Sequence, residues 1–381
     1  MKYFCFILLL AISIASCNSG NSLKNVGSIE ISGVTGVEGC CLDNMIEEAR
    51  VIALETNDSS IILNPEEIVV NSSNIYVRDG YQNGGVAIFD INGKFVRRLQ
   101  NGPAPFEIGK ARSIYYDETS DCLYVYDNSG MKIMKYTHDG IFVSSTTCEI
   151  YALSIAAHNG KMFFASIWNK GNSELEIIET DSLVNITNKT SLGKQAYPDE
   201  ILMRYFYSKG DSILISKPWD NKIYCYFNGE YKYEELTDDN NTINYSNFDD
   251  SFSMIFSLDK EQIVFRGVHF CSNNWQLFSV YGNFYATFLF RNQNSGQLFL
   301  LKHSPNSLCN MIRIMTTQDA KEQNIVGMIS PEHLVNSSDN PDLTWDGSNP
   351  NNLISPDDME KLRNVKPDDN PIIVLFKLKD E

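Results

Sequence analysis

Two tryptophans with polar neighbours are the residues best suited to contact a ligand. Trp168 precedes an Asn-Lys pair, and Trp219 stands between Lys217 and Asp220. An aromatic face ringed by polar groups suits a sugar or a peptide. Two interpretations stay open: the rings form a platform for such a ligand, or they pack inside the fold.

Charged residues at the ends of expected strands extend this candidate site. Arg78, Asp79 and Arg112 occupy such ends. A guanidinium directs several N–H donors toward a carboxylate, so these arginines could bind an anionic group or pair with the aspartate. The sequence therefore predicts a ligand-binding set of Trp168, Trp219, Arg78 and Arg112.

No motif indicates a catalytic centre, a metal site or a cofactor. The five histidines form neither HxH nor HExxH, and GxSxG, P-loop and CxxC patterns do not occur. The acids in the segment 338–347 lack the spacing of a calcium loop. The net charge of −17 disfavours nucleic acid, because phosphates need a basic surface. We expect no catalytic residue, no metal and no cofactor.

The N-terminus resembles a bacterial lipoprotein signal. Lys2 precedes an apolar run over 4–14 that is too short to span a bilayer, and the run ends in Ile-Ala-Ser-Cys, with the cysteine at Cys17. Such a string is similar to a lipobox, in which the peptide is cut before the cysteine and the cysteine is acylated. The alternative is an ordinary secretory signal with an incidental cysteine. We predict a signal peptide over 1–16, a lipidated Cys17 with a tether over 17–45, and one folded domain over 46–381.

Short alternating apolar runs, separated by Asn-Gly and Asp-Gly steps, predict an all-β fold. IYVRD (75–79) and VAIFDINGKFV (86–96) recur about 48 residues later as LYVYD (123–127) and IMKYTHDGIFV (133–143). A repeat of about 40–50 residues with four strands is typical of a β-propeller. In the first repeat we expect strands at 68–71, 75–79, 86–91 and 94–99.

The chain length fits six four-stranded antiparallel blades, although counting alone leaves five or seven open. Strands alternate in direction, so the longer links of all blades emerge on one face. These links are 79–85, 100–112, 127–132, 167–174 and 217–222. Loops presented together by a rigid scaffold are where binding concentrates, so this face is the candidate functional face.

The C-terminal region predicts a short helix and a closing strand. Ser355 and Pro356 followed by two acids form a helix start, with Ser as N-cap and Pro at the first helical position. The helix should run to about Arg363, before the apolar strand in 370–381. Either 50–54 or 372–377 could close the ring and cover its open edge.

The chain also resembles a known family, the six-bladed β-propeller lipoproteins of Bacteroidetes, which are similar to NHL propellers. The resemblance rests on RVIALETNDSSII (50–62), IFDINGKFVRRL (88–99) with the following GPAPFE (102–107), and NPIIVLFKLK (370–379). It implies the propeller fold and a lipid anchor in the cell envelope, at the outer membrane and facing either the periplasm or the surface. It implies little about activity.

Two function classes follow. The first is a non-catalytic binding or scaffold lipoprotein, joined to the membrane by its lipid, whose partner is a glycan, a peptide or an envelope protein. The second is a carbohydrate-active enzyme, a lyase or hydrolase, with its site over the propeller channel. That enzyme would need carboxylates about 5–10 Å apart over the channel.

Overall fold

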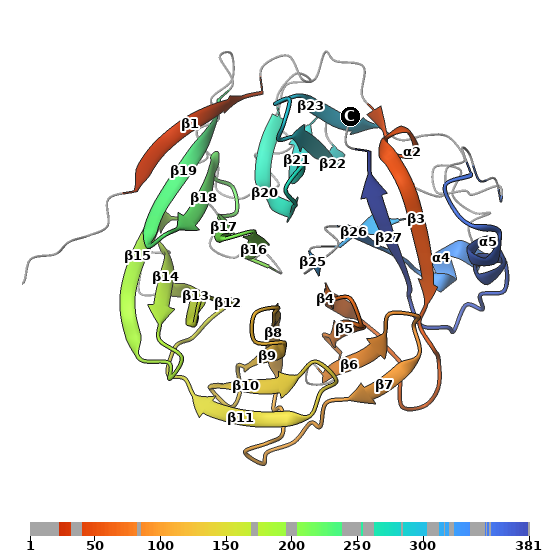
Figure 1. Ribbon diagram of the computed structural model, residues 1–381, viewed down its shortest axis with the longest axis horizontal. Coiled ribbons are helices and arrows are strands. Elements are labelled where there is room, and N and C mark those ends of the chain that lie inside the picture. The colour runs from red at the N-terminus through yellow and green to blue at the C-terminus, as the bar shows by residue number, and fades with distance from the viewer. Residues whose placement is uncertain are drawn as a thin grey trace, which may run out of the picture.

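A computed structural model of the chain contains six β-sheets arranged in a ring, which is a six-bladed β-propeller (Figure 1). The structure describes residues 23–31, 40–81, 85–168, 174–195, 204–237, 253, 263–282, 285–302, 312–315, 317–319, 324–335, 347, 349 and 352–379. Within these ranges no helix is long and apolar enough to cross a membrane. The predicted all-β fold with four-stranded antiparallel blades is confirmed.

Blades 1 to 5 each start at the centre of the ring and step outward through four consecutive antiparallel strands. Blade 1 contains β4 (Pro65–Val70), β5 (Asn74–Asp79), β6 (Gly85–Asp90) and β7 (Phe95–Arg98). Blade 2 contains β8 (Ala111–Asp117), β9 (Cys122–Asp127), β10 (Lys132–Thr137) and β11 (Phe142–Thr147). Blade 3 contains β12 (Ser154–His158), β13 (Lys161–Trp168), β14 (Glu174–Thr180) and β15 (Ile186–Lys194).

Blade 4 contains β16 (Phe206–Lys209), β17 (Ser212–Ser216), β18 (Lys222–Phe227) and β19 (Glu230–Thr237). Blade 5 contains β20 (Ile263–Cys271), β21 (Trp275–Gly282), β22 (Tyr285–Asn292) and β23 (Leu298–Lys302). The β18–β19 turn is Asn228-Gly229, with φ values of 50° and 84°. Positive φ at both turn residues is typical of a tight hairpin whose twist matches that of its strands.

The core lies between neighbouring blades. Side chains alternate along each inner strand, and both faces of that strand are covered. On β5, Ile75 and Val77 pack in a cluster with blade 6, whereas Tyr76 between them packs in a cluster with blade 2. The outermost strand β11 is mostly exposed, because it is the edge strand of its sheet. Successive side chains of a strand point to opposite faces, so an inner strand such as β5 is buried at every position, whereas an outer strand such as β11 is not. This difference distinguishes the inner strands of a blade from the outer ones.

Blade 6 combines the two ends of the chain. Its strands, from the centre outward, are β24 (Arg313–Ile314), β26 (Ile325–Ile329), β27 (Ile372–Leu378) and β3 (Ile46–Ala53). The two segments predicted as alternatives for closing the ring, 50–54 and 372–377, both lie in this blade, where they pair as β3 and β27. The N-terminal strand β3 is the outermost strand. Between β24 and β26, the short strand β25 (Thr317–Asp319) pairs in parallel with β4 on the inner side of blade 1.

The N-terminal segment follows the perimeter of the ring before it reaches blade 6 (Figure 1). β1 (Lys24–Glu30) pairs in parallel with β19, and β2 (Cys40–Cys41) pairs in parallel with β23. The helical turn α2 (Leu42–Met45) then leads into β3. Parts of the range 17–45, predicted as a tether, therefore belong to the propeller, since they cover the open edges of two blades. The predicted signal peptide 1–16 and Cys17 lie outside the described residues.

A helical insertion joins β26 to β27 and covers the outer edge of β3. It contains α4 (Pro331–Val335) and α5 (Pro356–Arg363). The Ser355 side chain accepts a hydrogen bond from the Asp358 backbone N–H at 3.1 Å, which confirms the predicted N-cap. Asp358 Oδ2 accepts a hydrogen bond from the Val51 N–H at 3.0 Å. The helix thus satisfies a backbone group that the edge strand would otherwise expose.

Candidate functional site

The links between strands divide the ring into two faces. We letter the four strands of each blade A to D from the centre outward. The tight-turn face is the end that carries the A–B and C–D turns, including 71–73, 91–94, 138–141, 181–185 and 228–229. The long-link face is the opposite end, with the links 55–64, 99–110, 128–131 and 148–153. Of the links predicted to share a face, 100–112, 127–132 and 217–222 are described there. Residues 82–84 and 169–173 of two others lie outside the described residues.

A repeated aspartate organises the long-link face. Asp79 ends β5 and accepts hydrogen bonds from the backbone N–H groups of Leu63, Asn64 and Tyr81. Asp127 ends β9 and accepts equivalent bonds from Gly109, Lys110 and Gly130.

Burial opposes ionisation of Asp127, but these amide donors outweigh it and hold the pKa of Asp127 below its usual value. From the sequence, Asp79 is a candidate partner for an arginine near a bound anion. In the structure its carboxylate instead accepts backbone hydrogen bonds, which is a structural role. Its carboxylate ties the link before strand A to the link after strand B.

At the long-link end of the inner strands, two arginines surround one buried glutamate. Arg78 Nε lies 3.2 Å from Glu67 Oε2, and Arg204 Nη2 lies 3.2 Å from Glu67 Oε1. Arg78 Nη1 also contacts Glu66 Oε2 at 2.6 Å. We call Glu66, Glu67, Arg78 and Arg204 the channel cluster. Glu67, Arg78 and Arg204 are buried, whereas a quarter of the Glu66 side chain is exposed.

The position of Arg204 follows from a hydrogen-bond pattern that joins successive inner strands. Glu67 Oε2 accepts from Ile114 N at 3.0 Å, Ser113 Oγ accepts from Ile155 N at 3.4 Å, and Ser154 Oγ accepts from Tyr205 N at 3.4 Å. Ser113 and Ser154 each stand one residue before the donor of their own blade, Ile114 and Ile155. In blade 4 that residue is Arg204, which has no acceptor atom.

In blade 4 a different residue provides the acceptor for the next blade, and the Arg204 side chain contacts other blades instead. Ser216 Oγ accepts the Val268 N–H of blade 5 at 2.9 Å. Arg204 extends to blades 1 and 2, where Nη2 also donates to Ile114 O at 3.1 Å. Blades 1 and 4 are opposite in the ring (Figure 1), so this side chain crosses its centre. A second bridge joins Tyr115 Oη of blade 2 to Ser208 Oγ of blade 4 at 2.6 Å.

The channel cluster holds more donors than acceptors. Three buried donors, Arg78 Nη2, Arg204 Nε and Arg204 Nη1, have no hydrogen-bond partner within the described part of the chain, against one such acceptor, Glu67 Oε1, which lies 3.2 Å from Arg204 Nη2 in an ion pair. A buried donor without a partner costs about 1–3 kcal/mol. An unpartnered donor of this kind would be stabilised by water or by an acceptor group of a ligand.

The predicted ligand residues lie in different environments. Arg78 pairs with glutamates rather than with Asp79. Arg112 is partly exposed at a β-bulge near the start of β8, and such a bulge redirects a side chain. Trp219 is buried, and its ring stacks on Tyr281 of blade 5 at 5.6 Å with an interplanar angle of 15°. Of the two interpretations given for this ring, packing inside the fold is therefore the one that Trp219 follows. Trp168 ends β13, and its side chain lies outside the described residues.

Sequence reasoning missed the aromatic and apolar residues that are exposed on the long-link face. They lie on the links of blades 1 to 3 and are Ile61, Leu63, Tyr81, Phe106 and Tyr151. Tyr81 and Phe106 fall inside links that had been predicted to bind. The signal that could have identified Tyr81 and Phe106 was the presence of an aromatic residue within a link that was expected to be exposed.

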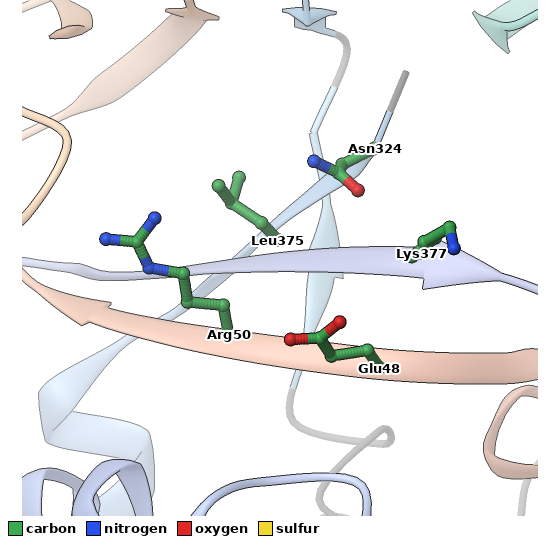
Figure 2. A pocket seen from close by; sticks show the side chains of 5 residues that line it. All are labelled: Glu48, Arg50, Asn324, Leu375 and Lys377. Carbon is green, nitrogen blue, oxygen red and sulfur yellow. The ribbon is translucent and has the colours of Figure 1, made fainter. Parts of the chain in front are cut away.

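A cavity of about 320 Å³ lies at blade 6, lined by Glu48, Arg50, Asn324, Leu375 and Lys377 (Figure 2). Leu375 pairs with Arg50, and Lys377 with Glu48, so the four side chains share one face of the β3–β27 pair. Arg50 Nη2 donates to Ile91 O and Asn92 Oδ1 in a turn of blade 1. The cavity therefore borders blade 1 on the tight-turn side, away from the channel cluster.

The described residues contain no group of three or more histidine, cysteine or acidic side chains that could hold a metal ion. Glu66 and Glu67 are carboxylates at the channel, as the enzyme hypothesis would require. Both are engaged by Arg78, an arrangement that favours charge pairing over proton transfer.

Comparison with known proteins agrees with the fold. A protein of Bacteroides fragilis NCTC 9343, described as a proposed exported protein, matches with a TM-score of 0.68 at 15% identity, over 92% of this chain and 99% of its own. A member of the DUF4221 family from Bacteroides vulgatus matches with a TM-score of 0.53 at 9% identity, over 88% of this chain and 98% of its own. No curated protein matches.

The family profile described as "Domain of unknown function (DUF4934)" matches residues 28–377. This range includes strands of all six blades, the perimeter strand β2 and the end of β1, residues 28–30. The chain therefore belongs to the DUF4934 family.

Proposed function

We propose that the protein is a lipid-anchored envelope protein whose propeller binds a partner through the long-link face without transforming it. The partner is a glycan or peptide that combines an acidic group with a ring or apolar part. The excess of guanidinium donors in the channel cluster carries this proposal, since it occurs at the same end of the ring as the exposed aromatic links.

The two kinds of side chain have complementary roles in this proposal. Tyr81, Phe106 and Tyr151 offer flat faces on which sugar rings or peptide side chains stack. Arg112 supplies directed donors to a carboxylate. Glu66, the most exposed carboxylate of the channel cluster, is the group that a ligand carboxylate would replace at Arg78. Trp168 ends β13 at the same face and stays part of the proposed site.

Binding is tested with the mature chain on a glycan array and a peptide library, followed by titration of each hit. Phe106→Ala and Tyr151→Ala should each weaken binding about tenfold, as expected for the loss of about 1.4 kcal/mol of stacking. Arg112→Ala should weaken only ligands that carry an acidic group. Ile186→Ala, on the tight-turn face with similar exposure, is the matched control. A titrated ligand with unchanged affinity in all three variants would contradict the proposed site.

The anchor has its own test. Cys17→Ala should move the protein from the membrane fraction to the soluble fraction, because the acylated side chain is the proposed attachment. The location is supported by the lipobox-like string at 14–17 and by the likeness to a proposed exported protein. Equal membrane association of the variant and the parent would rule out Cys17 as the anchor.

A further inference from the structure

The direction of β1 determines where the N-terminal chain joins the propeller. β1 runs parallel to β19, with Lys24 beside Lys232 and Glu30 beside Thr237. β19 begins just after the Asn228-Gly229 turn, which belongs to the tight-turn face. The chain therefore enters β1 at the tight-turn face, on the perimeter of blade 4.

The distance from Cys17 to this entry point is short. Residues 17–24 can extend at most about 25 Å when fully stretched. β1 and β19 run side by side along the perimeter of the ring, away from this entry point (Figure 1). A lipid at Cys17 would therefore hold the start of β1, and the neighbouring tight turn of blade 4, within about 25 Å of the anchoring surface.

Exposed apolar side chains occur at the tight turn beside this entry point and at the equivalent turns of the two preceding blades. They belong to the C–D hairpins of blades 2, 3 and 4, and to β1 itself. The residues are Val26, Ile141, Phe142, Val143, Leu183, Ile186 and Phe227. Single exposed apolar residues are ordinary on a protein surface, but here they recur at the equivalent turn of three consecutive blades.

Charges beside these residues fit a shallow contact with lipid. Lys232 Nζ lies 5.7 Å above the Phe227 ring and 3.2 Å from the exposed Glu230 carboxylate, and its neighbour across the strand pair is Lys24. Lysines beside apolar side chains suit the boundary between headgroups and acyl chains. Hydrogen bonds from Thr137 and from Asn185 hold the pKa values of Asp139 and Asp181 below their usual range. These acids stay ionised, which excludes deep insertion of the turns.

We propose that the tight-turn edge of blades 2 to 4 rests on the lipid surface to which Cys17 is anchored, so that the long-link face points away from the membrane. This inference rests on the proposed lipid anchor. It adds an orientation: the long-link face is open to the compartment, and the apolar tight turns touch the headgroup region.

The test compares labels on the two faces of the acylated full-length protein. Ile186→Cys places a label on the tight-turn side, and Tyr151→Cys places one on the long-link side, at residues that are 51% and 47% exposed. Leu183→Cys and Phe106→Cys form a second pair. Each variant carries an environment-sensitive fluorophore and is reconstituted in phosphatidylcholine vesicles that contain a lipid with a nitroxide near its headgroup. The labelled parent corrects for native cysteines.

Quenching at 183 and 186 should exceed quenching at 106 and 151 at least threefold. Equal quenching on both faces, or stronger quenching at 106 and 151, would overturn the orientation. Incorporation of an alkyne fatty acid at Cys17 is measured on the same samples. Its absence would refute the anchor, whereas full incorporation with equal quenching would refute only the orientation.

Discussion

Replacing Glu67 with glutamine should destabilise the propeller more than removing Arg204, one of the two arginines around it. Every group found to contact the Glu67 carboxylate is a donor: Arg78 Nε and Ile114 N at Oε2, and Arg204 Nη2 at Oε1. A glutamine must point its NH₂ group at one of these donors in either orientation. It also removes the buried negative charge between two buried guanidinium groups.

Breaking a buried ion pair by removing one partner costs about 3–5 kcal/mol. We therefore expect Glu67→Gln to lower the free energy of unfolding by that amount. Arg204→Met should cost less, about 0–2 kcal/mol, because an apolar side chain of similar length also removes two unpartnered buried nitrogens, Nε and Nη1. Glu67 would keep Arg78 and the Ile114 N–H as donors.

The assay is equilibrium unfolding in urea, followed by far-UV circular dichroism, of the mature chain, of both single variants and of the double variant. Because the two side chains are in contact, the double variant should be more stable than the sum of the single effects predicts. Additive effects, or a greater loss in Arg204→Met than in Glu67→Gln, would refute the assignment of Glu67 as the acceptor that holds the cluster together.

Two further predictions concern other parts of the ring. Asp358→Ala should lower the free energy of unfolding by about 1–3 kcal/mol, because the Val51 N–H of the closing strand loses its acceptor, whereas Asp357→Ala, at an exposed position of the same helical turn, should have a smaller effect in the same urea titration. Burial lowers the pKa of His269 to about 4 from 6.5, and its Nε2 lies 2.9 Å from Ile314 O of blade 6. The unfolded state then binds the proton more readily, so this histidine should reduce stability as the pH falls from 6.5 to 4, by at most about 1.4 kcal/mol per pH unit. His269→Gln should remove that part of the pH dependence; an identical pH profile of the parent and His269→Gln would contradict it.

Much of the fold was predictable because its signals are local. The repeated IYVRD and LYVYD segments form β5 and β9, and the expected strand 68–71 overlaps β4, which begins three residues earlier. The Ser-Pro-Asp-Asp start of α5 depends only on side chains within one turn. Local periodicity and capping suffice in such places, because the covering blades only reinforce a conformation that the segment already favours.

The channel cluster and the perimeter strands depend on contacts between distant segments, which local patterns do not report. Arg204 precedes β16 without any motif, and its partner Glu67 lies in the opposite blade. β1 buries only Ile29 among its seven residues, so it lacks a strand signature and forms because β19 has an open edge. The polar neighbours of Trp219 left both a ligand platform and packing inside the fold open, and only the contact with Tyr281 of the adjacent blade decides that the ring is packed.

The closing blade also sets the order in which the protein can fold. β3 is among the first segments to be synthesised and β27 is the last, and the hydrogen bond from Val51 to Asp358 joins residues 307 positions apart. Until the C-terminus emerges, the apolar face of β3 has no partner, and the inner edge of blade 1 lacks β25. Long-range pairing of this kind slows folding and prolongs the exposure of aggregation-prone edges. For the envelope location proposed above, a chain of this topology would gain by remaining unfolded until translocation is complete, so that both ends arrive in the same compartment before the ring closes.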